Sequence, residues 1–363
     1  MKRIVLAYSG GLGTTVAIPW LADQYDAEIV TLTLDLGQSR ELTEVRERAL
    51  AAGAVRAHVL DVREEFVRDY ILRALQAGAS LDGPTPIASA LACPIIAKRL
   101  VEIARMEGAS AVAFGGRAGE SAFRIEEAVK QLAPSLETIA AVRGFSTTDA
   151  IAYASERSLA LPADETDADS PGNLWGRSIV TDVDEAVPED ARFTLTRAPE
   201  DCPDEPATVA VEYESGVPVR TNGLEMPLLE MIESLETIAG VHGVGRIESR
   251  RRGGTQYAAL EAPAAVVLST AHKALQALVL PRELDRLAPA MTRTFDDLVQ
   301  DGQWFSPARE AIAAFVSAIQ TRVTGTVTVR LFKGECRVVS AHSPNPRDRV
   351  SARRPVKRLS AGR

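Results

Sequence analysis

The sequence predicts an α/β protein, in which a parallel-sheet domain is followed by an α+β domain. Up to about residue 165, short apolar runs rich in β-branched residues alternate with longer stretches whose apolar positions recur at helical spacing. This alternation is typical of βαβ units, which place parallel strands in one sheet. Beyond residue 165, strand and helix patterns no longer alternate regularly, which favours an α+β arrangement.

Each element of the first part has its own signal. Strands are predicted where β-branched and apolar residues cluster, and helices where apolar positions repeat every three to four residues. The predicted strands cover residues 4–8, 28–34, 57–60 and 111–114. The predicted helices cover residues 16–25, with a start near Thr14, then 42–52, a stretch rich in Arg and Glu after residue 60, and 95–107. Gly53 and Gly108 stand where a glycine commonly ends a helix.

A change of composition near residue 165 predicts a domain boundary. The stretches LPADETDADSPGNLWG (161–176) and APEDCPDEP (198–206) are polar and rich in turn residues. After them we expect strands at 208–214 and 323–332, and helices at 224–240, 265–280 and 307–321. The division is therefore 1–165, 166–340 and a basic tail, 341–363, which we expect to be disordered.

Composition excludes several classes of protein. The chain has 363 residues, of which 46% are hydrophobic and 25% charged, which is enough for well-packed cores. Its net charge of -8 argues against nucleic acid as a partner. The three cysteines form no CxxC pair, so we expect neither a disulfide framework nor a thiolate metal site. We therefore expect a cytoplasmic location. No apolar run is long enough to cross a membrane, so we expect no membrane partner.

The first motif, AYSGGLGTT (7–15), follows the first strand. Glycine tolerates positive φ, so the turn at Ser9, Gly10 and Gly11 can gather backbone N–H groups at the positive end of a helix. Thr14 or Thr15 could cap that helix or donate to a phosphate oxygen. Two interpretations stay open at this point: an anion-binding loop, or an ordinary tight connection between a strand and a helix.

Three polar or glycine positions fall at the carboxyl ends of predicted strands. These are Ser9, Asp35 and Gly115. In parallel sheets, ligands bind outside the carboxyl ends of the strands. The pattern therefore favours a ligand site at this edge of the sheet.

Several longer segments occur in the order known for one family. They are AYSGGLGTT (7–15), DLGQ (35–38), ALACPIIAKRLVEIARMEGASAVAFG (90–115), GNLWGRSI (172–179), GVHGVGRIE (240–248), WFSPAREAIAAFV (304–316) and VTGTVTVRLFKG (323–334). Through these segments the chain resembles the argininosuccinate synthase family, of the N-type ATP pyrophosphatase superfamily, over residues 1 to about 340. It resembles a divergent member, because several substrate positions differ.

The resemblance implies an ATP-binding domain followed by a synthetase domain, with ATP and Mg²⁺ as cofactors. In the family, a ureido oxygen of citrulline attacks the α-phosphate of ATP and releases pyrophosphate, and the amine of aspartate then displaces AMP. The implied partners are small molecules and further copies of the chain. The implied ATP-binding residues are Ala7, Tyr8, Ser9, Gly10, Gly11, Gly13, Thr14, Thr15, Leu34 and Gly115. The implied substrate-binding residues are Thr85, Ser89, Arg117, Glu120, Ser121, Arg124, Ser178 and Tyr257, with Ser9 and Arg124 as catalytic residues.

One departure from the family lies in the ATP loop. The family has Asp where this chain has Gly13, so a carboxylate beside the triphosphate, which could help to hold Mg²⁺, is missing. Losing such a supporting group commonly costs about 10–100-fold in affinity or activity. Asp35 is the candidate substitute and so a candidate metal ligand, or else it caps the end of its strand.

Other departures lie at the substrate positions. The family's Tyr, Thr and Arg near the start of the helix at 95–107 become Thr85, Ser89 and Cys93. Arg117 either holds a carboxylate or phosphate with its planar fork or faces solvent. Leu260 replaces a family Tyr, and Tyr257 is the nearby candidate to serve instead.

We therefore expect an AMP-forming ligase that adenylates a carbonyl or carboxylate oxygen and joins it to an amine. The departures favour an acceptor other than citrulline, in a specialised biosynthetic pathway. Two alternatives remain: a non-catalytic nucleotide-binding homologue with a decayed site, and a true argininosuccinate synthase in which other groups compensate. The intact Ser9-Gly10-Gly11 turn and Arg124 favour an enzyme, whereas Gly13 favours decay.

Overall fold

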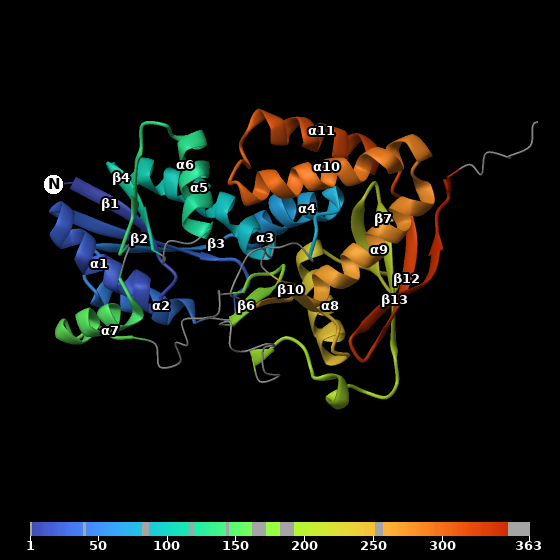
Figure 1. Cartoon of the computed structure of the whole chain (residues 1–363), viewed down its shortest axis with the longest axis horizontal. Coiled ribbons are helices and arrows are strands. Elements are labelled where there is room, and N and C mark those ends of the chain that lie inside the picture. The colour runs from blue at the N-terminus through green and yellow to red at the C-terminus, as the bar shows by residue number, and fades with distance from the viewer. Residues whose placement is uncertain are drawn as a thin grey trace, which may run out of the picture.

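The computed structural model of the chain describes residues 2–38, 41–81, 87–115, 120–142, 145–161, 172–181, 192–250 and 257–347. Three sheets organise this part of the chain. In Figure 1 a sheet of N-terminal strands lies at one end of the molecule, a sheet built largely from C-terminal strands lies at the other, and a smaller sheet lies between them.

The N-terminal sheet is parallel, as the alternating pattern predicted. Its strands are β1 (Lys2–Ala7), β2 (Ala27–Asp35), β3 (Arg56–Asp61), β4 (Ala111–Phe114) and β5 (Glu137–Ala140), in the order β3-β2-β1-β4-β5. The strand order reverses beside β1, and a crevice forms outside the carboxyl ends of the strands at such a point. The fold therefore offers a ligand site where β1 and β4 end.

Helices cover both faces of this sheet, because successive side chains of a strand point to opposite sides. Ile4 and Leu6 of β1 pack in one core with α1 (Leu12–Tyr25), α2 (Leu42–Ala51) and α7 (Thr147–Glu156). Val5 packs in the other core with α5 (Ile87–Glu107) and α6 (Glu120–Leu132). Figure 1 shows α1 and α7 on one side of the sheet and α5 and α6 on the other.

Two helices begin earlier than predicted. Helix α1 begins at Leu12 after Gly11, which takes an extended conformation at the N-cap, and not near Thr14. Helix α5 begins at Ile87 and contains Pro94, so the predicted start at residue 95 is wrong. The apolar residues before Pro94 are mostly buried, and this burial stabilises helical backbone that proline alone would end.

The stretch after β3 joins the two halves of the chain. It forms α3 (Arg63–Phe66), a π-helical turn at Val67–Ile71 and α4 (Leu72–Ala77). Helix α4 contacts α9 (Pro263–Val279), α10 (Arg282–Gln300) and α11 (Pro307–Gln320). One hydrophobic core therefore runs across the expected boundary near residue 165 and includes residues as distant as Val5 and Val329.

The second half is α+β, as expected. An antiparallel sheet of order β10-β11-β6 holds β6 (Arg177–Thr181), β10 (Arg246–Arg250) and β11 (Tyr257–Glu261). A larger antiparallel sheet of order β13-β12-β7-β8-β9 holds β7 (Ala207–Glu214), β8 (Val217–Thr221), β9 (Leu224–Glu225), β12 (Gly325–Phe332) and β13 (Glu335–His342). A 3-10 turn covers Pro199–Asp201. Helix α8 (Leu228–Val241) starts later than predicted, because Leu224–Glu225 pairs with β8 instead.

The tail at 341–363 was expected to be disordered, but its first residues are folded. Strand β13 continues to His342, and the Ser343 hydroxyl donates to the Thr324 carbonyl at 2.7 Å. Arg347 donates from its backbone N–H to the Leu278 carbonyl at 2.8 Å and forms an ion pair with Asp285 at 2.7 Å. Residues 341–347 are therefore folded onto α9 and α10, and residues 348–363 lie outside the described part of the chain.

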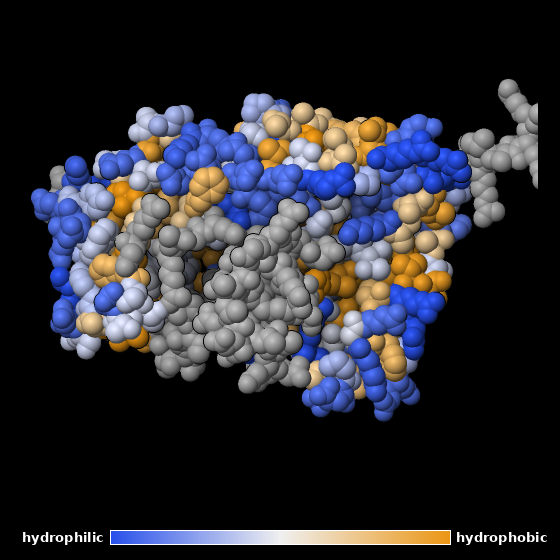
Figure 2. Space-filling model, in the orientation of Figure 1, coloured by the Kyte–Doolittle hydropathy of each residue, from blue (hydrophilic) through white to orange (hydrophobic). Residues whose placement is uncertain are grey.

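The coloured part of the face in Figure 2 mixes hydrophilic and hydrophobic side chains, and one hydrophobic group lies over α10 and α11. Among the residues that the structure describes, no helix combines the length and the apolar character that crossing a membrane requires.

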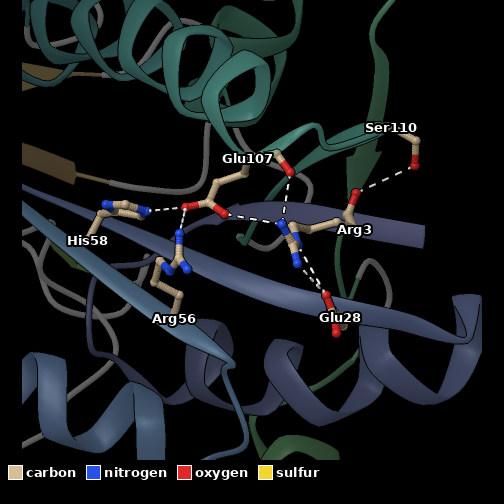
Figure 3. A network of polar contacts seen from close by, with 6 residues as sticks. All are labelled: Arg3, Glu28, Arg56, His58, Glu107 and Ser110. Atoms are coloured by element: carbon tan, nitrogen blue, oxygen red, sulfur yellow. Dashed lines mark hydrogen bonds and ion pairs between the residues drawn. The ribbon is translucent and has the colours of Figure 1, made fainter. Parts of the chain in front are cut away.

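A network of charged groups ties the amino-terminal edge of the N-terminal sheet to the end of α5 (Figure 3). The Glu107 side chain is 2% exposed and accepts hydrogen bonds at 2.8 Å from Arg56 and at 3.3 Å from Arg3; His58 Nε2 lies at 2.8 Å. Arg3 also pairs with Glu28 at 2.7 Å. Burial raises the pKa of Glu107, but the hydrogen bonds from His58 and Arg56 outweigh burial and hold that pKa below its usual value.

Replacing Glu107 by Gln is expected to lower the free energy of unfolding by about 1–3 kcal/mol at pH 7, because a charged acceptor is lost from a buried position. A carboxyl whose pKa falls on folding stabilises the protein above its unfolded pKa, and that contribution disappears as the pH falls through the folded pKa. The difference between the two proteins should therefore shrink below about pH 4.

Denaturant unfolding at pH 7 and at acid pH measures this difference. The matched control is Glu102→Gln on the same helix, since Glu102 is 41% exposed and forms an ion pair with Arg99. A stability loss at Glu107 no larger than the loss at Glu102 would contradict the assignment.

Candidate functional site

A cavity of about 380 Å³ opens at the carboxyl ends of β1, β2 and β4, where the strand order reverses. This volume is in the range of small-molecule sites. Its walls are the ends of the three strands, one side of α5, the start of α6 and the turn before β6. The lining residues are Ala7, Tyr8, Ser9, Thr14, Leu32, Thr33, Leu34, Leu36, Gln38, Ser89, Ala92, Cys93, Ile96, Phe114, Gly115, Ser121, Ile125, Gly172 and Asn173.

The loop between β1 and α1 places a hydroxyl and backbone amides at a helix N-terminus. Ser9 Oγ lies 3.1 Å from Thr14 Oγ1 and accepts from the Gly11 N–H at 3.4 Å. Gly10 has φ of +84°, and a β-carbon there would lie 3.1 Å from the methyl groups of Val45, so glycine suits this position. The arrangement is able to bind an anion at the positive end of α1.

Thr15 supports this loop from behind rather than lining the cavity. Its side chain is fully buried, and its Oγ1 lies 3.0 Å from the Tyr8 hydroxyl. The Tyr8 carbonyl in turn accepts from the Thr33 hydroxyl at 2.9 Å. Thr15 and Thr33 therefore fix Tyr8, which does line the cavity.

Two further glycines of the predicted ATP site differ in their surroundings. Gly115 lines the cavity, and a β-carbon there would lie 2.5 Å from Thr14 Cγ2, so a larger residue would displace the loop. Gly13 has open space around it, since a β-carbon would meet no atom within 4 Å. A side chain at Gly13 is therefore sterically possible.

Asp35 acts as the cap of its strand, one of the two roles that the sequence left open. Its Oδ1 accepts from the Gly37 N–H at 2.9 Å, and its Oδ2 lies 3.5 Å from Arg63 Nε. Gln38 closes the same turn by donating to the Leu34 carbonyl at 2.6 Å. In the part of the chain that the structure describes, no three His, Cys, Asp or Glu side chains come together to hold a metal ion.

Helix α5 and β6 bring two of the predicted substrate residues together. Ser89 Oγ, in the cavity wall, lies 3.2 Å from Ser178 Oγ, which stands behind it. Cys93, one turn further along α5, also lines the cavity. Burial raises the pKa of the Cys93 thiol to about 11, so this group is an uncharged wall at neutral pH.

Arg124, which the resemblance makes a catalytic residue, lies behind the cavity wall. It is 4% exposed, and its Nε donates to the Gln300 carbonyl at 2.9 Å, while its Nη2 donates to the Gln300 side chain. Ser121 and Ile125 of the same helix line the cavity, but Arg124 does not. In this structure its guanidinium ties α6 to the end of α10.

Other predicted residues fall outside what the structure describes. Thr85 and Arg117 are among the residues not described, and so are the side chains of Glu120 and Tyr257. Gly10, Gly11, Gly13 and Ser178 are described but do not line the cavity.

Several lining residues were not among the predicted site residues. Leu32, Thr33, Leu36 and Gln38 flank positions already singled out on or after β2, and Phe114 precedes Gly115, so their place at strand ends was a usable signal. Ala92, Cys93, Ile96, Ile125, Gly172 and Asn173 come from helices and a turn that only tertiary packing brings here. None of the described lining residues carries a charged side chain.

Comparisons with known proteins identify relatives along both halves of the chain. The family model of the argininosuccinate synthase N-terminal HUP domain matches residues 3–160, and the model of the C-terminal domain matches residues 169–347. The argininosuccinate synthases of Bacillus thuringiensis (strain Al Hakam) and Bacillus cereus (strain 03BB102) are each 45% identical to the chain over 348 residues, which is 92% of this chain and 85% of theirs.

Two solved structures show a weaker likeness. They are a predicted subunit of tRNA methyltransferase from Methanocaldococcus jannaschii, with a TM-score of 0.30 at 17% identity, and a 4-thiouridine synthetase in complex with RNA and ATP, with a TM-score of 0.29 at 18% identity. Each match covers 43% of this chain, and 75% and 40% of the other chains respectively. Scores this low carry no argument about the present chain.

The family assignment rests instead on the two matched domain models and on identity along most of the chain. It agrees with the parallel sheet, the Ser-Gly-Gly loop and the cavity at the strand ends. The chain belongs to the argininosuccinate synthase family, whose members are AMP-forming carbon–nitrogen ligases that use ATP.

Proposed function

We propose that the chain catalyses the argininosuccinate synthase reaction itself, joining citrulline to aspartate with conversion of ATP to AMP and pyrophosphate. The observation that carries this proposal is the 45% identity to argininosuccinate synthases over 92% of the chain. The cavity supports it, because six of the ten residues predicted to bind ATP line its wall: Ala7, Tyr8, Ser9, Thr14, Leu34 and Gly115. The identity favours citrulline over the different acceptor that the departures suggested.

In this proposal the loop between β1 and α1 binds the phosphates. The N–H groups of Gly10 and Gly11, the Ser9 hydroxyl and the positive end of α1 stabilise the negative charge of the leaving pyrophosphate. The apolar residues at the ends of β2 and β4 exclude water from the nucleotide. Ser89 offers a hydroxyl to the acceptor, and the protein contributes by holding the ureido oxygen in line with the α-phosphate.

We propose that Mg²⁺ arrives on the ATP rather than in a carboxylate cage of the protein. The described residues hold no cluster of metal-binding groups, and Asp35 is engaged by Gly37 and Arg63. Mg²⁺ commonly binds through substrate phosphates and water in this way.

A second candidate function keeps the same chemistry with a different acceptor. Cys93 favours it, because an uncharged thiol stands in the cavity wall where the resemblance implies an arginine. Leu260 favours it too, since this residue in place of a family Tyr is fully buried in β11 opposite Ser178. The chain is also proposed to form an oligomer, which light scattering measures. A cytoplasmic location is proposed too, and the free Cys93, Cys202 and Cys336 support it.

Ser9→Ala and Gly11→Val are expected to weaken ATP binding by roughly 10–100-fold each, because a hydrogen bond to a charged acceptor contributes about 1.5–3 kcal/mol. Gly11 has φ of -82°, which any residue adopts, so the valine variant should fold while its side chain covers the amide. Calorimetric titration with Mg·ATP measures the affinities. Ser155→Ala, at an exposed position on α7, is the control, and affinities equal to that of the control would refute the loop as the phosphate site.

Gly13→Asp is expected to strengthen ATP binding when Mg²⁺ is present and to weaken it when Mg²⁺ is chelated. The open space at Gly13 admits the carboxylate, which attracts the metal ion but repels bare phosphate. Gly13→Asn is the matched neutral control, and Asp35→Asn should leave the Mg²⁺ dependence unchanged. Titrations across a range of Mg²⁺ concentrations decide the matter; a loss of Mg²⁺ dependence in Asp35→Asn would assign the metal to Asp35 instead.

Incubation with Mg·ATP, citrulline and aspartate is expected to yield argininosuccinate and AMP in equal amounts, at a rate above about 1 per second. Ser89→Ala should lower kcat/KM for citrulline by about 10-fold or more, because an acceptor group loses its hydrogen bond. Chromatography of AMP and of the product measures both. Pyrophosphate exchange that requires another ureido, carboxylate or amide compound would instead support the second candidate.

A further inference from the structure

The turn at residues 172–176 borders the cavity opposite α5 and ties the two halves of the chain together. The Asn173 N–H donates to the Gly176 carbonyl at 3.1 Å, and the Gly176 N–H donates to the Asn173 carbonyl at 2.9 Å, which closes the turn. Asn173 is 7% exposed, and both ends of its carboxamide are bonded. Oδ1 accepts from the Trp175 N–H at 2.8 Å, and Nδ2 donates to the Ala88 carbonyl at 2.9 Å.

The segment of α5 that receives this bond depends on support from outside the helix. Pro94 has no N–H, so the Ala90 carbonyl receives no helical hydrogen bond from it. Residues 87–93 therefore lack one of the hydrogen bonds that would join them to the rest of α5, and their position depends on packing and on contacts with other elements. A carbonyl has two acceptor positions, so Ala88 accepts from Asn173 without giving up its bond within the helix.

The same segment carries Ser89, which lines the cavity. Its Oγ meets Ser178 Oγ at 3.2 Å, and its carbonyl lies 3.5 Å from Cys93 Sγ. Asn173 bonds the neighbouring carbonyl, that of Ala88. The direction of the Ser89 hydroxyl is therefore set by contacts from the second half of the chain.

We infer that Asn173 is a positioning residue for the acceptor: by holding the Ala88 carbonyl it fixes the first turns of α5, and with them the place of Ser89 in the cavity wall. This inference rests on the proposed function for the identity of the acceptor. The tether, which is the hydrogen bond from Asn173 to the Ala88 carbonyl, is independent of the proposed function.

The tether is tested without any substrate, by hydrogen exchange of the whole protein followed by mass spectrometry. Asn173→Ala is expected to speed exchange of the Leu91, Ala92 and Cys93 amides by about 10-fold or more, because their helical bonds open more often. Asn222→Gly is the matched control. The Asn222 carboxamide also accepts from a backbone N–H, that of Ala210 at 2.8 Å, but in the sheet remote from the cavity, and glycine suits its φ of 51°. Unchanged exchange at residues 91–93 in Asn173→Ala would overturn the inference, whether or not citrulline is turned over.

The route through Ser89 is tested by kinetics. Asn173→Ala is expected to lower kcat/KM for citrulline about 10–100-fold, chiefly through KM, while the Kd for Mg·ATP changes less than about 3-fold. If Asn173 acts through Ser89, the kcat/KM of the double variant with Ser89→Ala should be no lower than that of the more impaired single variant. Fold-losses that multiply in the double variant would overturn the route. Asn222→Gly should keep the parental kcat/KM.

Discussion

The contact between Leu174 and the turn at Leu36 and Gly37 is the constraint on which the cavity depends. The Leu174 N–H donates to the Leu36 carbonyl at 2.9 Å, and a β-carbon at Gly37 would lie 2.5 Å from Leu174 Cγ. Gly37 has φ of +88°, so glycine alone meets both the conformational and the steric demand without strain. This contact brings a turn of the second half of the chain onto the ends of the parallel strands, and the cavity forms between them.

Among the described residues, no charged side chain lines the cavity, and two buried carboxylates lie elsewhere. Glu107 lies at the amino-terminal edge of the sheet, where Arg3 and Arg56 neutralise it. Glu261 is fully buried beside β6 and accepts at 2.7 Å from the N–H groups of Leu195 and Thr196. Burying a charge is costly unless it is paired and hydrogen-bonded, and both carboxylates meet this condition. At the opposite edge of the sheet, the N-terminus of α1 and its backbone amides are able to stabilise a phosphate.

The packing shows the surroundings of three residues that the comparison with the family singled out. Gly13 leaves open space, so the change there removes a group without disturbing the loop. Asp35 is held by Gly37 and Arg63 in the turn after β2, in the capping role that the sequence offered beside that of a metal ligand. Arg124 is retained in the sequence, yet in this structure it holds the end of α10, so retention of a residue type did not by itself establish its role in the chemistry.

The sequence by itself determined the parallel sheet, the α+β second half, the family and the residues at the strand ends. These follow from local patterns, since hydrophobic periodicity and a glycine turn act over a few residues. It did not determine where α5 begins, because burial of residues 87–93 outweighs the local effect of Pro94. Only the tertiary structure decided that Asn173 reaches Ala88, that Ser178 stands behind Ser89 and that Cys93 faces the cavity. These contacts join residues up to 89 positions apart, and no local pattern in one sequence encodes such pairs.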